Sequence, residues 1–319
     1  MSRLFLCFIF QSMNIVGRTL GDNTAMKSID KTPIPIAVTV KWRVVTHKGL
    51  VRSQNEDAHY VAHKIEAKTE GKSTSRYLFA IADGLGGHKG GAIASRIALK
   101  AIKDEFTNWH GEAANHFVSR ALKHANQEVF IAGNSQPTLF ENMQTTLTAI
   151  TLEQGSLTIG HVGDCRFYRI RNGSIKLLTR DHTMANDLLH LHLISHKQVH
   201  QHPGRHQLTR SLGGEPVLNV DIIREQILPD DTYLLCSDGL WSEISDEEIE
   251  IVMQEKNIDT ACEKLVGLAL EAGAPDNITA IIFRVETIGK QDTSPFSWRT
   301  ILDRVPELLN KNSDPDNSF

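Results

Sequence analysis

The stretch RSQNEDAHY, residues 52–60, and the stretch YLFAIADGLGGHKGG, residues 77–91, decide how we interpret the whole chain. The second stretch is an apolar run that delivers Asp83 to a glycine-rich turn, and the first offers Glu56 and Asp57 side by side. A carboxylate at the end of a buried strand, on a loop that glycines allow to bend sharply, can hold a hard cation. The two stretches therefore predict part of a metal site.

Two later aspartates stand in the same setting, next to an apolar run. Asp238 follows such a run in YLLCSDGLW, residues 233–241, and Asp276 precedes one in PDNITAIIFRV. Carboxylates at strand ends far apart in the sequence predict one site assembled from several strands. The carbonyl oxygen of Gly84 can add a ligand, because glycine lets the backbone turn toward an ion. Arg52 is placed to bind an anion that the cations attract, which we take to be a phosphate.

Eight short motifs follow one another between about residues 43 and 285. They are RSQNED, IADGLGGHKGG, QTTLTA, GHVGDCRFYRIRNG, LTRDHT, LTRSLGG, LCSDGLW and PDNIT. In this order they resemble those of the metal-dependent serine/threonine protein phosphatases of type 2C, the PPM family, and particularly its bacterial members. Any one motif would be weak evidence, but the shared order leaves little room for coincidence.

The resemblance gives the candidate residues specific roles. It implies that Asp57 bridges two metal ions, that Asp83 and the Gly84 carbonyl bind one ion, and that Asp238 and Asp276 bind the other. Ligands that are all oxygen favour Mg²⁺ or Mn²⁺ over zinc. Two such ions close together lower the pKa of a bridging water, which attacks phosphorus in line.

Further positions are assigned in the same way. Glu56 is expected to act through a water on the metal, and Arg52 to bind the phosphate. Asp164, in GDCR, matches a ligand of a weaker third metal in bacterial members, although a plain β-turn role is equally open. Asn277 is expected to brace the loop of Asp276 rather than to contact substrate.

The proton donor for the leaving group has two candidates. Many eukaryotic members have a histidine two residues after the first strand-end aspartate, where this chain has Leu85. His88 lies three residues further on and could take over as the acid. We prefer the alternative, in which His88 structures the loop and water on the metal protonates the leaving group.

The pattern of apolar residues predicts an α+β fold. Residues 36–45 and 75–83 are typical of strands, and residues 91–109 and 112–132 of helices. The turns EQGS and RNGS predict three consecutive antiparallel strands within residues 145–179. Together with the resemblance, these elements predict a four-layer αββα sandwich, two antiparallel β-sheets flanked by helix pairs.

We expect three parts in the chain. Residues 1–35 should be a flexible N-terminal extension, residues 36–286 a single catalytic domain, and residues 287–319 a C-terminal tail with a short helix at 298–309. The apolar run in MSRLFLCFIF is short for a signal peptide and far too short to span a bilayer.

A histidine-rich excursion interrupts the domain. Residues 181–207 carry seven histidines, and an exposed helical excursion is favoured over a metal site because no paired ligand motif is present. The resemblance makes residues 183–207 a mobile flap beside the active site that controls substrate access. Asp181 and His182 are expected to hold its base.

Composition bounds the class of protein. A hydrophobic content of 40% and a charged content of 23% are typical of a soluble globular protein. A net charge of −4 argues against a general nucleic-acid binder. The four scattered cysteines show no metal-ligand spacing and favour a reducing, cytoplasmic setting: Cys7, Cys165, Cys236 and Cys262.

We therefore expect a monomeric, Mg²⁺- or Mn²⁺-dependent signalling phosphatase that hydrolyses phosphoserine and phosphothreonine proteins, including a Ser/Thr kinase or its substrates. Two alternatives remain. A catalytically silent relative would act as a binding module, but it should lack a core carboxylate, and all are present. A metal-dependent phosphodiesterase or nuclease would need a basic track, which the charge balance does not show.

Overall fold

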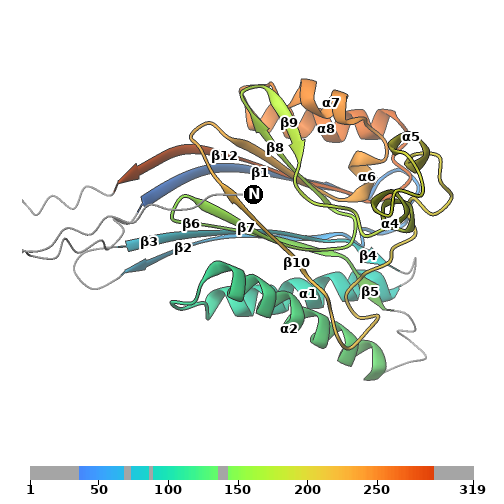
Figure 1. Ribbon diagram of the computed structural model, residues 1–319, viewed down its shortest axis with the longest axis horizontal. Coiled ribbons are helices and arrows are strands. Elements are labelled where there is room, and N and C mark those ends of the chain that lie inside the picture. Colours follow the sequence, from blue (N-terminus) through green and yellow to red (C-terminus); the bar gives the residue numbers. More distant parts are fainter. Residues whose placement is uncertain (1–35, 68–72, 86–88, 136–142, 291–319) are drawn as a thin grey trace, which may run out of the picture. The chain divides into compact units, whose positions relative to one another are not determined.

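The first and last strands of the described chain lie side by side. β1 (Ile36–His47) pairs antiparallel with β12 (Ile278–Lys290) over the whole length of β1. Figure 1 shows this pair in the computed structural model, which describes residues 36–67, 73–85, 89–135 and 143–290. Both ends of the described chain are thus held in one sheet.

Two five-stranded antiparallel sheets form the centre of the fold. One has the order β1-β12-β11-β8-β9, in which the further strands are β11 (Thr232–Cys236), β8 (Arg166–Arg171) and β9 (Ser174–Leu177). The other has the order β10-β7-β6-β3-β2, with β10 (Asp221–Gln226), β7 (Ser156–Val162), β6 (Leu147–Glu153), β3 (Ser73–Ala82) and β2 (Ala58–Ala67). A small pair, β4 (Gly84–Leu85) and β5 (Gln144–Thr145), extends beyond the second sheet.

Helices cover the outer face of each sheet. α1 (Lys89–Thr107) and α2 (Ala114–Ser135) lie on the β3-containing sheet, while α7 (Asp246–Val252) and α8 (Ile258–Glu271) lie on the other (Figure 1). Three short helices occupy connections: α4 (Met184–His190), α5 (His196–Val199) and α6 (Asp238–Trp241). The predicted four-layer αββα arrangement is confirmed.

The apolar run of β3 is continuous because both of its faces are buried. Phe79 and Ile81 face the core between the sheets, where Phe79 stacks on Phe283 of β12 at 4.2 Å between ring centroids. Leu78 and Ala80 face the other way, into the core beneath α1 and α2. A strand packed on both faces needs apolar side chains at every position rather than at alternate ones.

One strand was missed and one prediction about strands was wrong. β2 was not among the predicted strands. The strands around EQGS and RNGS were expected to form one consecutive antiparallel run. β6 pairs with β7 and β8 pairs with β9, but β7 and β8 belong to different sheets. The chain crosses between sheets at Gly163, whose φ of +115° is a conformation that other residues rarely adopt.

Further observations concern the ends of the elements. A capping box begins α7, where Ser245 and Glu248 each bond to the other's backbone. β12 continues to Lys290, beyond the domain end expected at residue 286. The proposed extension at 1–35 and the tail helix at 298–309 lie outside the described residues.

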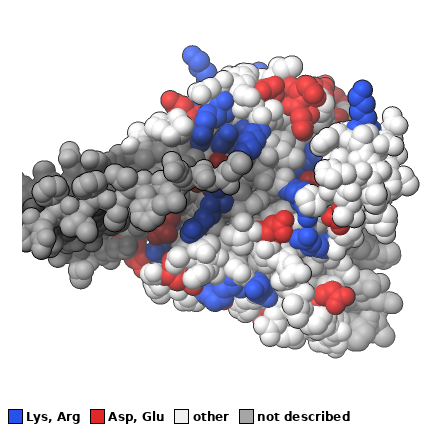
Figure 2. Space-filling view, viewed as in Figure 1, with Lys and Arg blue, Asp and Glu red and all other residues white. Residues whose placement is uncertain are grey.

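An ion pair joins the two sheets, because Arg169 of β8 contacts Glu225 of β10 at 2.9 Å. Within the first sheet, Arg171 of β8 contacts Asp231, the residue before β11, at 2.7 Å. Figure 2 shows basic and acidic side chains interspersed over the face in view. Within the described residues, no helix combines the length and apolar character needed to cross a bilayer.

Candidate metal site

Five aspartates from five separate strand ends gather in one place. Asp57 precedes β2, Asp83 follows β3, Asp164 lies between β7 and β8, Asp238 follows β11, and Asp276 precedes β12. Burial, followed by the charges of the other four, raises the pKa of Asp83 well above its usual value of 3.8. The charges of the other four aspartates thus act on Asp83, so the five lie close together.

The same two causes act on Asp57 and Asp238. Burial raises the pKa of Asp57 to about 6, with Asp276 and Glu56 adding repulsion. Burial and the charges of Asp276 and Asp57 raise the pKa of Asp238 to about 7. A carboxyl in such a site ionises with difficulty unless a cation compensates its charge.

Asp57 is held by two hydroxyl groups that the sequence interpretation did not identify. Ser237 Oγ and Thr279 Oγ1 both donate to Asp57 Oδ2 at 2.7 Å. These bonds fix the carboxylate and favour its ionised form, which opposes the effect of burial. Ser237 stands directly before Asp238, and Thr279 lies three residues after Asp276, so their closeness to the motifs was the available signal.

The backbone around Asp83 is fixed from β5 and β6. Asp83 N donates to Thr146 Oγ1 at 3.0 Å, and Thr145 Oγ1 donates to the Asp83 carbonyl at 2.7 Å. Gly84 follows, in close contact with the first turn of α1. A methyl group at Gly84 would lie 2.3 Å from the carbonyl oxygen of Gly91, so only glycine fits without displacing the helix.

Asn277 braces several loops at once. Its Nδ2 donates to the Lys48 carbonyl at 2.8 Å and to the Gln54 carbonyl at 2.9 Å. Its Oδ1 accepts from Glu56 N at 2.8 Å. Asn277 thus ties the loop of Asp276 to the loop of Glu56, the bracing role that the sequence suggested.

Glu56 and Arg52 lie at different depths. Glu56 is buried and accepts a 3.0 Å bond from Gln54 Nε2 at its Oε1. Arg52 is 41% exposed, and its guanidinium contacts Asp276 Oδ2 at 2.6 Å. Arg52 is therefore at the rim of the aspartate cluster, where its donors can be reached from solvent.

Asp164 lies at the far side of the cluster. Its side chain is buried, and burial followed by the charge of Asp238 raises its pKa well above the usual range. Asp164 and Asp238 therefore lie close enough for their charges to interact. His88, the possible proton donor, lies outside the described residues.

Two buried carboxylate oxygens of the cluster bear on its fit to divalent cations. Asp57 Oδ1 and Asp238 Oδ1 are buried oxygens without a hydrogen-bond partner among the described residues, although buried polar atoms are normally paired. Both face a site whose donors are oxygens, the ligands that Mg²⁺ and Mn²⁺ prefer. Within the described chain, no group of three or more His, Cys, Asp and Glu side chains is already arranged to hold a metal ion. The donor set fits hard cations.

Comparisons with known proteins point to one family. A sequence profile described as Protein phosphatase 2C matches residues 52–264. The serine/threonine protein phosphatase PstP of Mycobacterium tuberculosis is 32% identical over 260 residues, which cover 82% of this chain and 48% of PstP. The chain thus spans about half the length of that relative. The serine/threonine phosphatase stp of Listeria monocytogenes is 30% identical over 242 residues, which cover 74% of this chain and 92% of stp.

A solved structure gives the same result. The catalytic domain of PstP in complex with two manganese ions has a TM-score of 0.68 and 30% identity to this chain. The match covers 79% of this chain and 100% of that structure. The sandwich described above is therefore the fold of a relative that binds two manganese ions.

Proposed function

The chain belongs to the protein phosphatase 2C family, and we propose that it is a metal-dependent phosphatase of phosphoserine and phosphothreonine proteins. The observation that carries the proposal is the gathering of five aspartates from five strand ends around one site. The relative solved with two manganese ions supports Mg²⁺ or Mn²⁺ as the cofactor.

We assign the binding of two ions to Asp57, Asp83, the Gly84 carbonyl, Asp238 and Asp276. In this assignment Asp57 would be shared by both ions, Glu56 would act through water, and Asp164 would serve a weaker third ion. Two bound ions supply Lewis acidity, which lowers the pKa of water and offsets charge on a phosphate.

The chain's own residues prepare the site for this chemistry. The two hydroxyl donors on Asp57 Oδ2 favour the ionised form of that carboxylate and leave Oδ1 available for a ligand. Arg52 provides a planar, permanently charged fork for two phosphate oxygens. Because Arg52 is at the rim, we assign it to positioning the phosphate ester rather than to activating water.

The physiological role is a further part of the proposal. The buried, unpaired thiols of Cys165, Cys236 and Cys262 support a reducing, cytoplasmic setting. In a bacterial-type phosphatase the substrates would be phosphoproteins that a Ser/Thr kinase produces, or the kinase itself. We propose that the protein acts in such signalling as a monomer.

The proposal is tested by hydrolysis of a phosphothreonine peptide. Activity should require added Mn²⁺ or Mg²⁺, be lost in EDTA, and return when the metal is restored. Asp238→Ala should abolish it while the protein remains folded by circular dichroism. Turnover that persists in EDTA, or in Asp238→Ala at the wild-type rate, would overturn the proposal.

A further inference from the structure

The flap, residues 183–207, buries few of its side chains. Of its two helices, α4 buries only Ala185 and α5 buries no residue. Leu191 and Leu193 are more than 60% exposed, at 65% and 67%. A cavity of about 900 Å³ lies beneath these helices, against Arg166 and Leu177. Hydrophobic packing therefore does not fix the body of the flap.

The two ends of the flap are joined to each other. Met184 N donates to the Gln207 carbonyl at 2.9 Å, and Thr209 N donates to the His182 carbonyl at 2.8 Å. These bonds close the flap into a loop with a narrow base. Its orientation over the protein consequently depends on what holds the residues near that base.

Trp241 links the base of the flap to the aspartate cluster. It is the last residue of α6, the single helical turn that begins at Asp238. Its Nε1 donates to the backbone carbonyl of Asp164 at 3.0 Å. One indole is thereby fixed relative to two of the five clustered aspartates.

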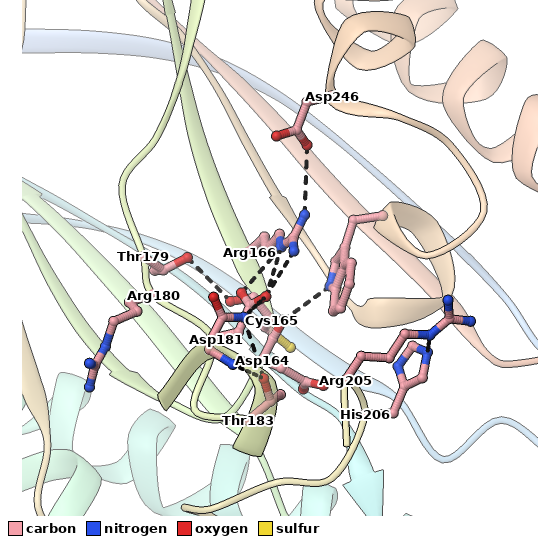
Figure 3. Close-up of polar contacts among 12 residues, drawn as sticks. Asp164, Cys165, Arg166, Thr179, Arg180, Asp181, Thr183, Arg205, His206 and Asp246 are labelled. Atoms are coloured by element: carbon pink, nitrogen blue, oxygen red, sulfur yellow. Dashed lines mark hydrogen bonds and ion pairs between the residues drawn. The ribbon is translucent and has the colours of Figure 1, made fainter. Parts of the chain in front are cut away.

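Arg166 connects the first end of the flap to that indole. Its guanidinium carbon lies 3.8 Å from the centroid of the Trp241 ring, a cation–π arrangement. The same guanidinium donates to Asp181 Oδ2 at 2.8 Å, and Asp181 Oδ2 accepts from Asn186 Nδ2 of α4 at 3.1 Å. Figure 3 shows Arg166 turned toward both Asp181 and Asp246. Arg166 is largely buried, so this connection is shielded from water.

The second end of the flap reaches the same indole. The His206 ring stacks on Trp241 with centroids 6.0 Å apart and planes at 26°. Arg205 Nε donates to His206 Nε2 at 2.8 Å (Figure 3). Arg205 also donates to the His200 carbonyl at 2.8 Å. Both ends of the flap therefore meet at a single side chain.

We propose that Trp241 is a positioning residue that sets the flap over the aspartate cluster, through Arg166 on one end and His206 on the other. The inference rests on the proposed function for its meaning in catalysis, but the contacts concern only this chain. Trp241 does not touch the reacting phosphate in this account. Trp241 fixes the position of the flap relative to the aspartate cluster when a protein substrate binds.

This arrangement predicts different effects on large and small substrates. A phosphopeptide extends beyond the phosphate and must fit between the flap and the rim of the site. A small aryl phosphate occupies the cluster alone. Loss of the indole should therefore impair peptide binding, because the flap is no longer held in place and a misplacement of about 1 Å lowers rates by up to about 100-fold. Chemistry on a small ester should be largely kept.

The first test measures the flap itself, without metal. Trp241→Leu should raise amide hydrogen exchange in residues 184–207 about tenfold or more in EDTA, while α2 keeps its protection. Trp241→Phe retains a ring for Arg166 and His206 and should leave the flap near wild type. Trp42→Leu, a distant tryptophan on β1, is the matched control. Equal flap exchange in wild type and Trp241→Leu would overturn the inference.

The second test separates the positioning role from general damage. In Mn²⁺, Trp241→Leu should raise KM for a phosphothreonine peptide about tenfold and change kcat for para-nitrophenyl phosphate by less than about threefold. An equal loss for both substrates would contradict a positioning role. His206→Ala, with His196→Ala as its control, gives the same comparison if Trp241→Leu does not fold. Absence of Mn²⁺-dependent hydrolysis in wild type would reject the proposed function, whereas the exchange test would still decide the inference.

Discussion

Replacing Asp238 with asparagine should stabilise the metal-free protein at pH 8, although it removes a proposed metal ligand. In the folded chain the pKa of Asp238 is raised from 3.8 to about 7, by burial first and then by the charges of Asp276 and Asp57. Between these pH values the folded state binds more protons than the unfolded state, so the carboxyl lowers stability as pH rises through them. Asparagine has nearly the same shape and does not ionise, so the variant does not lose this folding stability as pH rises.

The size of the gain follows from the shift in pKa. A rise from 3.8 to about 7 is about 3 units. At about 1.36 kcal/mol per unit, this sets an upper limit of about 4 kcal/mol. The neighbouring carboxyls share the repulsion, and solvent reaches the half-buried site, so we expect about 1–2 kcal/mol, or about 2–8 °C in Tm. The gain should vanish below about pH 4, where the carboxyl is protonated in both states.

Thermal unfolding of wild type and Asp238→Asn, measured in EDTA and in Mn²⁺, tests this prediction. Wild type should gain about 2.7 kcal/mol at a Mn²⁺ concentration of about 100 times Kd, while Asp238→Asn should gain much less. The order of stability should therefore reverse when metal is added. Asp104→Asn, on the exposed face of α1, is the matched control. The reasoning is refuted if Asp238→Asn is the less stable protein in EDTA at pH 8, or if both proteins gain equally from Mn²⁺.

Three other changes test separate parts of the site. Arg52→Ala should mainly raise KM for a phosphothreonine peptide, about tenfold or more, because the arginine positions the phosphate; a large fall in kcat at unchanged KM would contradict that role. Ser237→Ala removes one of the two donors to Asp57 Oδ2 and should weaken Mn²⁺ binding about tenfold by calorimetry, whereas an unchanged Kd would rule out the support we assign to it. Asn277→Ala leaves buried backbone groups without partners and should lower the free energy of unfolding by about 2–4 kcal/mol in urea. A loss below about 0.5 kcal/mol would mean that the loops do not depend on this side chain.

The sequence was most informative where local chemistry decides the structure. The apolar run before Asp83 forms a strand buried on both faces, and Ser245 and Glu248, three residues apart, form the capping box that such a spacing favours. The positions of the strand-end aspartates also followed from pattern, because an apolar run that ends in Asp and Gly has few alternative interpretations. These features depend on neighbours in the chain.

Features that depend on distant partners were not predicted from the residues. The jump between sheets at Gly163 is determined by which strands lie beside β7 and β8, and a hairpin motif carries no such information. The hydroxyls of Ser237 and Thr279 acquire their role only when β11 and β12 bring them to Asp57. Trp241 similarly reads as an apolar residue of a short helix until the fold places Arg166 on its ring.

The central claim is that Asp57 and the other clustered aspartates bind a pair of divalent ions, and electron paramagnetic resonance of the Mn²⁺-loaded protein tests it most directly. Two equivalents of Mn²⁺ should give the signal of two spin-coupled ions, and Asp57→Asn should lose that coupling. A spectrum of isolated, uncoupled Mn²⁺ in wild type at two equivalents would contradict the account.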